Sequence, residues 1–236
     1  MEPVSICLGI IATNEELPLT KFLPDLSAAF KGEVVGIDYE STDKTPELFK
    51  KYCKYSITEP WPRDFSKAKN QLIDMAERAG YDWLFILDAD ENMDTKKIPL
   101  LEKYIERNRY ENYYFPRIGF LTEEIIEGSI DGFPDLQARL FKLNCGFMFK
   151  EITHNQLCRN GKNIFEEGEG CVIPDIFIYH YGGLKGPESV LLKILEREAM
   201  AKGLPPVKDL SNSTIKDVKS WYMNLAAKPL KLICED

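Results

Sequence analysis

The sequence lacks the features that mark several classes of protein. It has no block of basic residues that could neutralise a nucleic-acid backbone, and its 38 acidic residues outnumber 30 lysines and arginines. Its six cysteines are scattered, with no CxxC pair, which predicts a reduced, cytoplasmic protein. The longest apolar run, residues 4–11, is far shorter than the roughly 20 residues of a membrane span. We therefore expect no nucleic-acid partner, and at most peripheral membrane contact through residues 221–234, which also fit a docked terminal helix.

Short apolar runs alternate with helical patterns over the first 118 residues, which is typical of a mostly parallel sheet built from βα units. The predicted strands cover residues 4–11, 33–38, 55–58, 82–88 and 112–118. One helix should begin with Thr45 as N-cap, and another should cover residues 66–79 with Gly80 just after its end. Later segments predict strands within residues 137–142 and 175–180 and helices at residues 187–202 and 214–227. Because no linker or repeat interrupts the chain, we expect one α/β domain.

A predicted buried strand runs directly into three carboxylates, Asp88, Asp90 and Glu91. Ligands bind beyond the carboxyl ends of strands in open α/β sheets, so these side chains lie where a site is expected. Alternation along an extended chain puts Asp88 and Asp90 on one side, where they can share a divalent cation that also holds phosphate oxygens. The pair therefore fits Mn²⁺ or Mg²⁺ with a nucleotide diphosphate. The alternative is an acidic, solvated loop that only ends a strand.

Three further motifs each follow a predicted strand and lead into a helix. They are IATNEE at residues 11–16, IDYESTDKT at 37–45 and DFSKAKN at 64–70. If the strands are parallel, these loops converge on the edge that carries the acidic pair. Asp38 is suited to accept a hydrogen bond from a base or ribose, Thr13 to donate one, and Lys67 or Lys69 to meet a phosphate. Residues 41–45 also fit a simple turn and helix cap.

Together with LDADE at residues 87–91, these motifs resemble, in the same order, the inverting, metal-dependent glycosyltransferases of family 2. The resemblance implies the GT-A fold, a three-layer α/β sandwich whose mostly parallel sheet has helices on both faces. Three later segments resemble the branch that decorates lipopolysaccharide cores: FPDLQARLFK at 133–142, ITHNQL at 152–157 and IYHYGG at 178–183. The resemblance implies a nucleotide-sugar-binding half (1–118), an acceptor and catalytic half (119–183) and C-terminal helices (184–236), in one domain that could be part of a larger protein.

The resemblance also assigns donor-site residues. Thr13, Glu15 and Asp38 would line the nucleotide pocket, while Asp88 and Asp90 would hold the cation and the sugar diphosphate. Lys69 stands where the family usually has arginine, a change that keeps the positive charge but loses the two-pronged hydrogen bonding of a guanidinium.

The catalytic base is left open by a departure from the branch pattern. Asn155 stands where the branch has glutamate, and an asparagine cannot accept the proton of the attacking hydroxyl. The remaining candidates are Asp135, Glu151 and His154.

Several other residues have both a functional and a structural interpretation. The chain has two histidines; we expect His180 to complete the metal shell beside Asp90, and His154 to face the acceptor or the diphosphate. Arg139 fits a diphosphate clamp and a structural ion pair equally well. Trp61 could stack on a base or sugar, or pack within its own loop.

These observations predict transfer of a sugar from a nucleotide-diphospho-sugar, with a UDP-sugar favoured, to a hydroxyl of a glycan or lipid-linked saccharide. The expected cofactor is Mn²⁺ or Mg²⁺, and the expected outcome is inversion at C1. One alternative is a sugar nucleotidyltransferase, which should have a glycine-rich, basic phosphate loop where residues 12–16 have neither glycine nor lysine. The other is a catalytically silent module that binds sugar nucleotides or glycans, which Asn155 would allow.

Overall fold

The computed structural model describes residues 4–107, 109–120, 135–153, 155–183 and 185–206. His154, the helix predicted at 214–227 and the apolar segment 221–234 lie outside the described residues. None of the described helices is long and apolar enough to cross a membrane. The described cysteines are free thiols: Cys7, Cys53, Cys145, Cys158 and Cys171.

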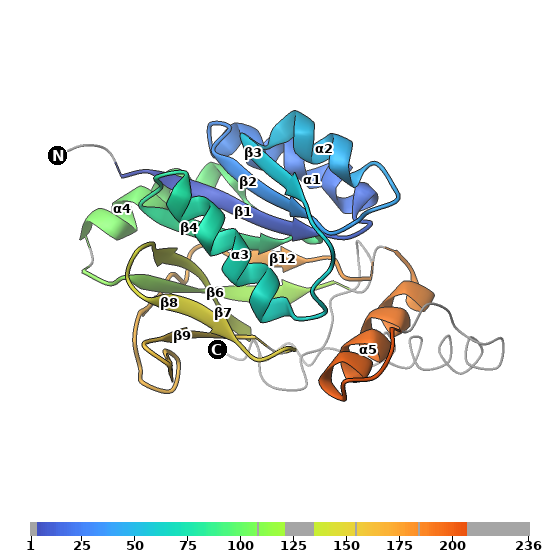
Figure 1. The fold of residues 1–236 in the computed structure, drawn as a ribbon. Coiled ribbons are helices and arrows are strands. Elements are labelled where there is room, and N and C mark those ends of the chain that lie inside the picture. The colour runs from blue at the N-terminus through green and yellow to red at the C-terminus, as the bar shows by residue number, and fades with distance from the viewer. Residues whose placement is uncertain (1–3, 108, 121–134, 154, 184, 207–236) are drawn as a thin grey trace, which may run out of the picture.

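A nine-stranded sheet forms the centre of the described structure, in the order β3-β2-β1-β4-β7-β6-β12-β5, with β11 paired to β6 (Figure 1). Its strands are β1 (Ile6–Ala12), β2 (Val34–Asp38), β3 (Tyr55–Thr58), β4 (Trp83–Asp88), β5 (Glu91–Met93), β6 (Asn112–Gly119), β7 (Asp135–Lys142), β11 (Cys171–Val172) and β12 (Ile178–His180). Strand β7 runs antiparallel to both β4 and β6, and β5 runs antiparallel to β12, while the other pairs are parallel. The predicted strands and the mostly parallel α/β sheet are thus confirmed.

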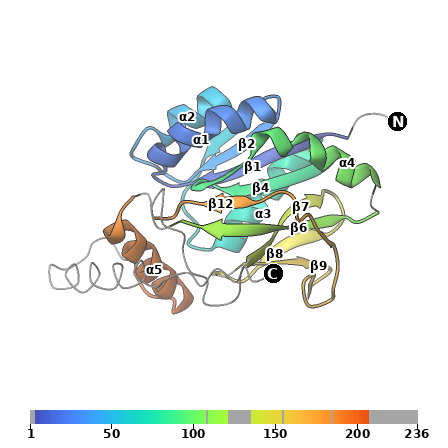
Figure 2. The same cartoon turned by 180° about the vertical axis from the view of Figure 1, so that it is seen from behind.

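Helices cover both faces of this sheet, as the prediction of a three-layer sandwich requires (Figures 1 and 2). Helices α1 (Glu16–Ala29), α2 (Thr45–Tyr52) and α4 (Pro99–Arg107) contribute to the core on one face, and α3 (Phe65–Arg78) contributes to the core on the other. A short 3-10 helix, η1 (Thr95–Lys97), precedes α4. A small antiparallel sheet of β8 (Phe147–Lys150), β9 (Gln156–Arg159) and β10 (Lys162–Asn163) packs on the α3 side. Helix α5 (Pro187–Ala201) lies beside the sandwich. Its bounds agree closely with the helix predicted at residues 187–202.

Strand β1 shows how the sequence builds the two cores. Leu8 and Ile10 belong to the core that includes α1, whereas Cys7 and Ile11 belong to the core that includes α3, as alternation along a buried strand requires. Between them, Gly9 lets α3 approach closely, because an added Cβ would lie 2.7 Å from a methyl carbon of Leu72. This packing holds the ends of β1 and its neighbours in fixed positions.

The predicted cap of α2 is wrong in its detail. Thr45 is the first residue of α2 rather than its N-cap, and its hydroxyl accepts a hydrogen bond from the Glu15 N–H at 2.9 Å. The N-cap position is occupied by Lys44, and the carboxylate of Asp43, one residue earlier, accepts from the Thr45 N–H at 2.9 Å. The hydroxyl of Thr45 is therefore used to join two loops. The bounds of α3 agree with the helix predicted at residues 66–79 to within one residue at each end. Gly80 has the left-handed φ of +82° expected after a helix.

Candidate active site

The loops that follow β1, β2 and β4 meet at one edge of the sheet. Ala12 pairs with Asp38 on β2, and Ile11 pairs with Asp88 on β4, so the last residues of the three strands lie side by side. This register confirms that the first two motifs converge on the edge that carries the acidic pair. It follows directly from the parallel pairing of the strands.

A ladder of hydrogen bonds holds the β1 and β2 loops together. The Thr13 hydroxyl donates to the Tyr39 carbonyl at 3.2 Å, and the Asn14 N–H donates to the Ser41 hydroxyl at 2.8 Å. In return, the Thr42 N–H donates to Asn14 Oδ1 at 2.7 Å. The polar residues of these motifs therefore fasten one loop to the other, and Thr13 uses its hydroxyl proton for this purpose.

Asp38 carries an acceptor that lacks a partner in the described part of the protein. Its side chain is 1% exposed, and its Oδ1 accepts only a long bond, 3.4 Å, from the Ser41 N–H. Its Oδ2 is buried without a hydrogen-bond partner. Leaving a buried acceptor unpaired costs about 1–3 kcal/mol, so a protein usually keeps one for a ligand or a water molecule. The predicted contact of Asp38 with a base or ribose would use this free acceptor, and it stays a prediction.

The acidic turn links the middle of the sheet to its far edge. Asp88 ends β4, and Glu91 begins β5, which pairs with β12. The Asp88 N–H donates to Glu91 Oε2 at 3.0 Å, and the Tyr181 N–H donates to the Asp90 carbonyl at 2.8 Å. These two hydrogen bonds fix the turn, so the carboxylates of Asp88 and Asp90 are presented by rigid elements.

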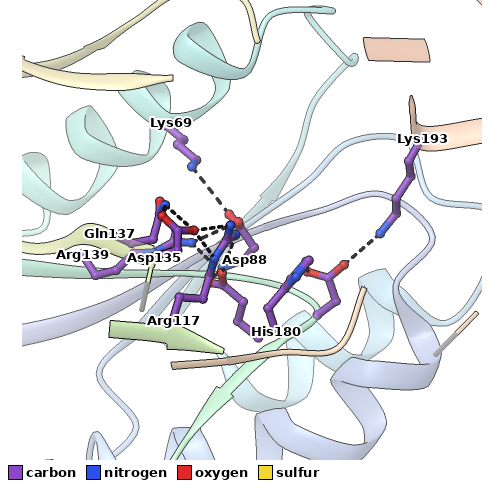
Figure 3. A network of polar contacts seen from close by, with 10 residues as sticks. Lys69, Asp88, Arg117, Asp135, Gln137, Arg139, His180 and Lys193 are labelled. Carbon is purple, nitrogen blue, oxygen red and sulfur yellow. Dashed lines mark hydrogen bonds and ion pairs between the residues drawn. The ribbon is translucent and has the colours of Figure 1, made fainter. Parts of the chain in front are cut away.

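Buried cations face Asp88 (Figure 3). Lys69 Nζ lies 3.6 Å from Asp88 Oδ1, and Arg139 Nη2 lies 3.3 Å from Asp88 Oδ2 and 2.6 Å from Glu91 Oε1. Arg139 is 3% exposed and Lys69 is 9% exposed. Arg139 was interpreted as either a diphosphate clamp or a structural ion pair. The structure shows the ion pair, and its guanidinium lies inside the site.

Burial and these partners shift the acid–base properties of the network. Burial opposes ionisation of Asp88, but Lys69 and Arg139 outweigh it and hold the pKa of Asp88 well below its usual range. Burial lowers the pKa of Lys69, which Asp88 only partly offsets. For Glu91, burial raises the pKa despite the nearby Arg139.

Two lysines that the sequence analysis did not single out complete the site. Lys193 Nζ, on α5, lies 2.9 Å from Asp90 Oδ2 and 3.2 Å from Glu15 Oε1, while Lys185 Nζ lies 2.8 Å from Glu15 Oε2. His180 Nε2 lies 3.6 Å from Asp90 Oδ1, as expected for a residue beside the acidic pair. Burial disfavours the charge on Asp90, yet Lys193 and His180 bring its pKa to about 2. The sequence did contain a signal, because Lys193 interrupts the apolar run VLLKIL at residues 190–195.

Two of the three candidate bases, Asp135 and Glu151, lie within the described residues. Asp135 Oδ2 accepts from Arg117 Nε at 2.9 Å and Nη2 at 2.6 Å, and Gln137 Nε2 donates to both Asp135 oxygens, at 2.9 and 3.0 Å. Arg117 Nη1 also lies 3.7 Å from Glu91 Oε1, which connects Asp135 to the acidic turn. Glu151 lies exposed just after the end of β8, outside the strands of the small sheet. The structure thus brings Asp135 into the network of the site.

The side chains predicted to hold a metal are the kinds that Mn²⁺ accepts, two carboxylates and an imidazole. Within the described ranges, however, no three His, Cys, Asp or Glu side chains are arranged as a ligand set. Asp88 faces Lys69 and Arg139, and Asp90 faces Lys193. The donor set suits a divalent ion in kind, and the described structure has the ammonium group of Lys193 at one oxygen of Asp90.

Trp61 packs within the α3 side of the core. Its ring meets Tyr39 edge-on with centroids 5.1 Å apart, and Phe65 edge-on at 5.0 Å. The guanidinium carbon of Arg197, on α5, lies over the ring of Phe65, 5.7 Å from its centroid. These contacts agree with the interpretation that Trp61 packs within its own loop.

A family model, described as glycosyl transferase family 2, matches residues 7–163. The match covers more than half of the chain and contains the loops after β1, β2 and β4. The chain belongs to this family. Membership agrees with the fold and with the acidic turn described above.

Curated relatives match part of the chain. The prophage-derived glycosyltransferase SunS of Bacillus subtilis (strain 168) is 33% identical over 160 residues, which are 64% of this chain and 34% of SunS. A TPR repeat-containing protein of Synechococcus elongatus is 35% identical over 96 residues, which are 39% of this chain and 22% of that protein. The match thus spans about a third of the length of SunS and less than a quarter of the length of the TPR repeat-containing protein.

Solved structures share the fold at low sequence identity. TarS 1-349 of S. aureus, solved in complex with UDP-GlcNAc, has a TM-score of 0.55 at 14% identity, covering 94% of this chain and 72% of that chain. A cytidylyltransferase from Leptospira borgpetersenii has a TM-score of 0.50 at 14% identity, covering 96% of this chain and 99% of that one. These likenesses show the nucleotide-sugar transferase fold, which sugar transferases and nucleotidyltransferases both use.

Proposed function

We propose that this chain transfers a sugar from a nucleotide-diphospho-sugar to a hydroxyl of a glycan or a lipid-linked saccharide, with inversion at C1. The observation that carries the proposal is the acidic turn at residues 88–91, which ends the central strand β4 in a family 2 domain, at the same sheet edge as Asp38. Glycosyl transfer requires a site that binds a nucleotide and stabilises a leaving diphosphate. Both requirements have matching groups at this edge.

Asp38 would bind the nucleotide. Its unpaired Oδ2 is suited to accept a hydrogen bond from an N–H of the base or a hydroxyl of the ribose. The fold likeness to TarS, which was solved with UDP-GlcNAc, supports a UDP-sugar as the favoured donor.

The diphosphate would lie among the cations of the site. Breaking the bond between C1 and the diphosphate leaves negative charge on phosphate oxygens, so fixed positive charges nearby stabilise the transition state more than the bound substrate. Lys69 and Arg139 are buried and held by Asp88, so they would meet this charge without reorganisation. Mn²⁺ or Mg²⁺ held by Asp88 and Asp90, with His180 as third ligand, would supply further Lewis-acid stabilisation.

Asp135 would remove the proton of the attacking hydroxyl. Arg117 and Gln137 orient its carboxylate, and its side chain is 38% exposed, which leaves it accessible to an acceptor. Glu151 and His154 are the alternatives, and replacement of each by Gln or Asn separates the three. Loss of the base should lower turnover at saturating donor while donor affinity is kept.

Thermal melting with UDP, GDP, ADP and dTDP, each with and without Mn²⁺, tests the donor site. A ligand at about 100 times its Kd should add roughly 2.7 kcal/mol, which is several degrees for a chain of this size. We expect the largest shift with UDP and Mn²⁺, and its loss in Asp90→Asn. Asp74→Asn, which changes an exposed acid on α3, is the matched control.

Product analysis then separates the alternatives. A transferase releases UDP from a UDP-sugar, whereas a nucleotidyltransferase would release pyrophosphate from a nucleoside triphosphate and a sugar phosphate. Binding without either product would indicate the silent module. A protein that no nucleotide stabilises in the presence of Mn²⁺ would contradict the proposal.

A further inference from the structure

Lys193 joins two of the motif loops from outside them. Its ammonium group lies 2.9 Å from Asp90 Oδ2 and 3.2 Å from Glu15 Oε1, so one side chain of α5 spans the loop after β1 and the turn after β4. Asp90 and Glu15 are themselves largely buried, at 9% and 7% exposure. Two largely buried carboxylates therefore hold one ammonium group between them, an arrangement that favours the charged form of the lysine.

The carboxylates of the acidic turn already have counter-ions within the described structure. Five carboxylates of the site each lie within 4.0 Å of a lysine or arginine: Glu15, Asp88, Asp90, Glu91 and Asp135 face Lys69, Arg117, Arg139, Lys185 and Lys193. A divalent ion on Asp90 would therefore add charge to a carboxylate that already has a counter-ion. Two cations that share one carboxylate at such short range repel each other strongly where water is excluded.

We infer that Lys193 is a tethered counter-ion of the donor site, which holds Asp90 in the unloaded protein and which a divalent cation must displace in order to bind there. This inference rests on the proposed function, because it concerns the cation that the donor diphosphate would need. It makes Lys193 a positioning residue that competes with the metal. It also gives a reason for a lysine to interrupt the apolar segment of α5 at residues 190–195.

The side chain is suited to such an exchange. Lysine carries a compact charge on a flexible stem, so its ammonium group can leave one carboxylate for another acceptor without movement of the backbone. Helix α5 itself is held separately, because Arg63 Nε donates to Glu196 Oε1 at 3.1 Å and Arg63 Nη1 donates to the Leu204 carbonyl at 2.6 Å. Glu15 accepts from Lys193 as well, so the displaced ammonium group keeps a partner beside the site.

A purely structural role for Lys193 makes a different prediction. If the lysine only fastens α5 to the loops, its removal lowers stability and leaves the affinity of Asp90 for a metal unchanged or reduced. If the lysine competes with the metal, its removal raises that affinity. The direction of the change in metal affinity therefore separates the two roles.

The test is a titration of the full chain with Mn²⁺ alone, without nucleotide, followed by the electron paramagnetic resonance signal of free Mn²⁺ and by calorimetry. We expect Lys193→Met to bind Mn²⁺ about tenfold more tightly than the wild type, or more, since a hydrogen-bonded ion pair no longer has to be broken. Lys193→Arg should keep the wild-type affinity. Lys202→Met is the matched control, because Lys202 lies just past the same helix and pairs with Glu198, 3.5 Å away.

Adding Asp90→Asn to Lys193→Met should abolish the gain, which shows that the metal binds at the acidic turn. If Lys193→Met does not fold, Lys193→Gln makes the same measurement while keeping a hydrogen-bond donor. Equal or weaker Mn²⁺ binding by the folded variant would overturn the inference, and so would the absence of Mn²⁺ binding in both wild type and variant. Failure of the proposed function has a separate signature, since it appears as a lack of nucleotide binding and not in this titration.

Discussion

Arg139 and Glu91 form a buried ion pair at the centre of the site, with Arg139 Nη2 2.6 Å from Glu91 Oε1 and side-chain exposures of 4% and 0%. The other oxygen of Glu91 accepts from the Asp88 N–H, so the pair connects β7 to the acidic turn. Arg139 Nε is buried without a hydrogen-bond partner, which leaves part of the cost of burying the guanidinium uncompensated. The pair therefore orients the turn more than it stabilises the fold.

Removing only one partner of this pair should be strongly destabilising. Arg139→Met leaves Glu91 and Asp88 buried without their guanidinium, and we expect a loss of about 3–5 kcal/mol in the free energy of unfolding. Urea denaturation measures it. Lys31→Met is the control, because Lys31 and Glu102 form an exposed pair at 3.6 Å that should contribute less than about 1 kcal/mol. Equal losses in the two variants would contradict the assignment of a buried pair.

Asp38→Leu should separate binding from stability. The substitution removes the unpaired acceptor at similar volume, so we expect an unchanged or slightly higher free energy of unfolding. The affinity for UDP in Mn²⁺ should fall by roughly 10- to 100-fold, the value of one hydrogen bond to a charged group. Titration calorimetry gives the affinity, and Glu40→Gln, an exposed change in the same loop, serves as control. Unaltered affinity would remove Asp38 from the nucleotide pocket.

The features that depend on parallel strand pairing were predictable from the sequence. The apolar runs fixed β1, β2 and β4, and once these strands pair in parallel, Asp38 and Asp88 must lie at one edge. The strand-like segment at residues 137–142 likewise became β7. Local periodicity and the direction of the chain are sufficient for such predictions.

The partners of the carboxylates were not predictable in the same way. Lys193 meets Asp90 across 103 positions of the chain, and local sequence patterns do not report such contacts. The prediction that Thr45 caps α2 was wrong for a related reason. The Thr45 hydroxyl accepts a hydrogen bond from the Glu15 N–H in another loop, and not from its own helix. Tertiary packing decides which of several suitable partners a polar side chain meets.

Gly182→Ala should disturb His180 without unfolding the protein. An added Cβ would lie 2.7 Å from Cε1 and 3.0 Å from Nε2 of the His180 ring, which would have to turn away from Asp90. We expect turnover to fall by about tenfold, since a misplaced ligand or hydrogen-bonding group typically costs 10- to 100-fold, with less than about 1 kcal/mol lost in stability. A double-mutant cycle with His180→Ala provides the control, because Gly182→Ala should have no further effect once the ring is absent. Additive effects on turnover would show that Gly182 acts elsewhere.

The Ser5–Asp82 pair predicts one component of the pH dependence of stability. Asp82 Oδ2 accepts from the Ser5 N–H at 2.9 Å and from the Ser5 hydroxyl at 2.7 Å, and these two bonds lower the pKa of Asp82. A carboxyl with a depressed folded pKa stabilises the protein above its unfolded pKa of about 3.9, and this stability is lost as the pH falls through the folded value. Asp82→Asn should therefore cost about 1 kcal/mol at pH near 7.

The difference in unfolding free energy between wild type and Asp82→Asn is the quantity to follow, by urea denaturation at several pH values. Other acids titrate in both proteins and cancel in this difference. It should stay constant from about pH 8 to pH 6 and shrink below about pH 4, where the wild-type carboxyl takes up a proton. Ser5→Ala, which keeps the backbone N–H, should show a smaller difference with the same dependence on pH. A difference that persists undiminished in acid would mean that the charge of Asp82 does not stabilise the start of β1.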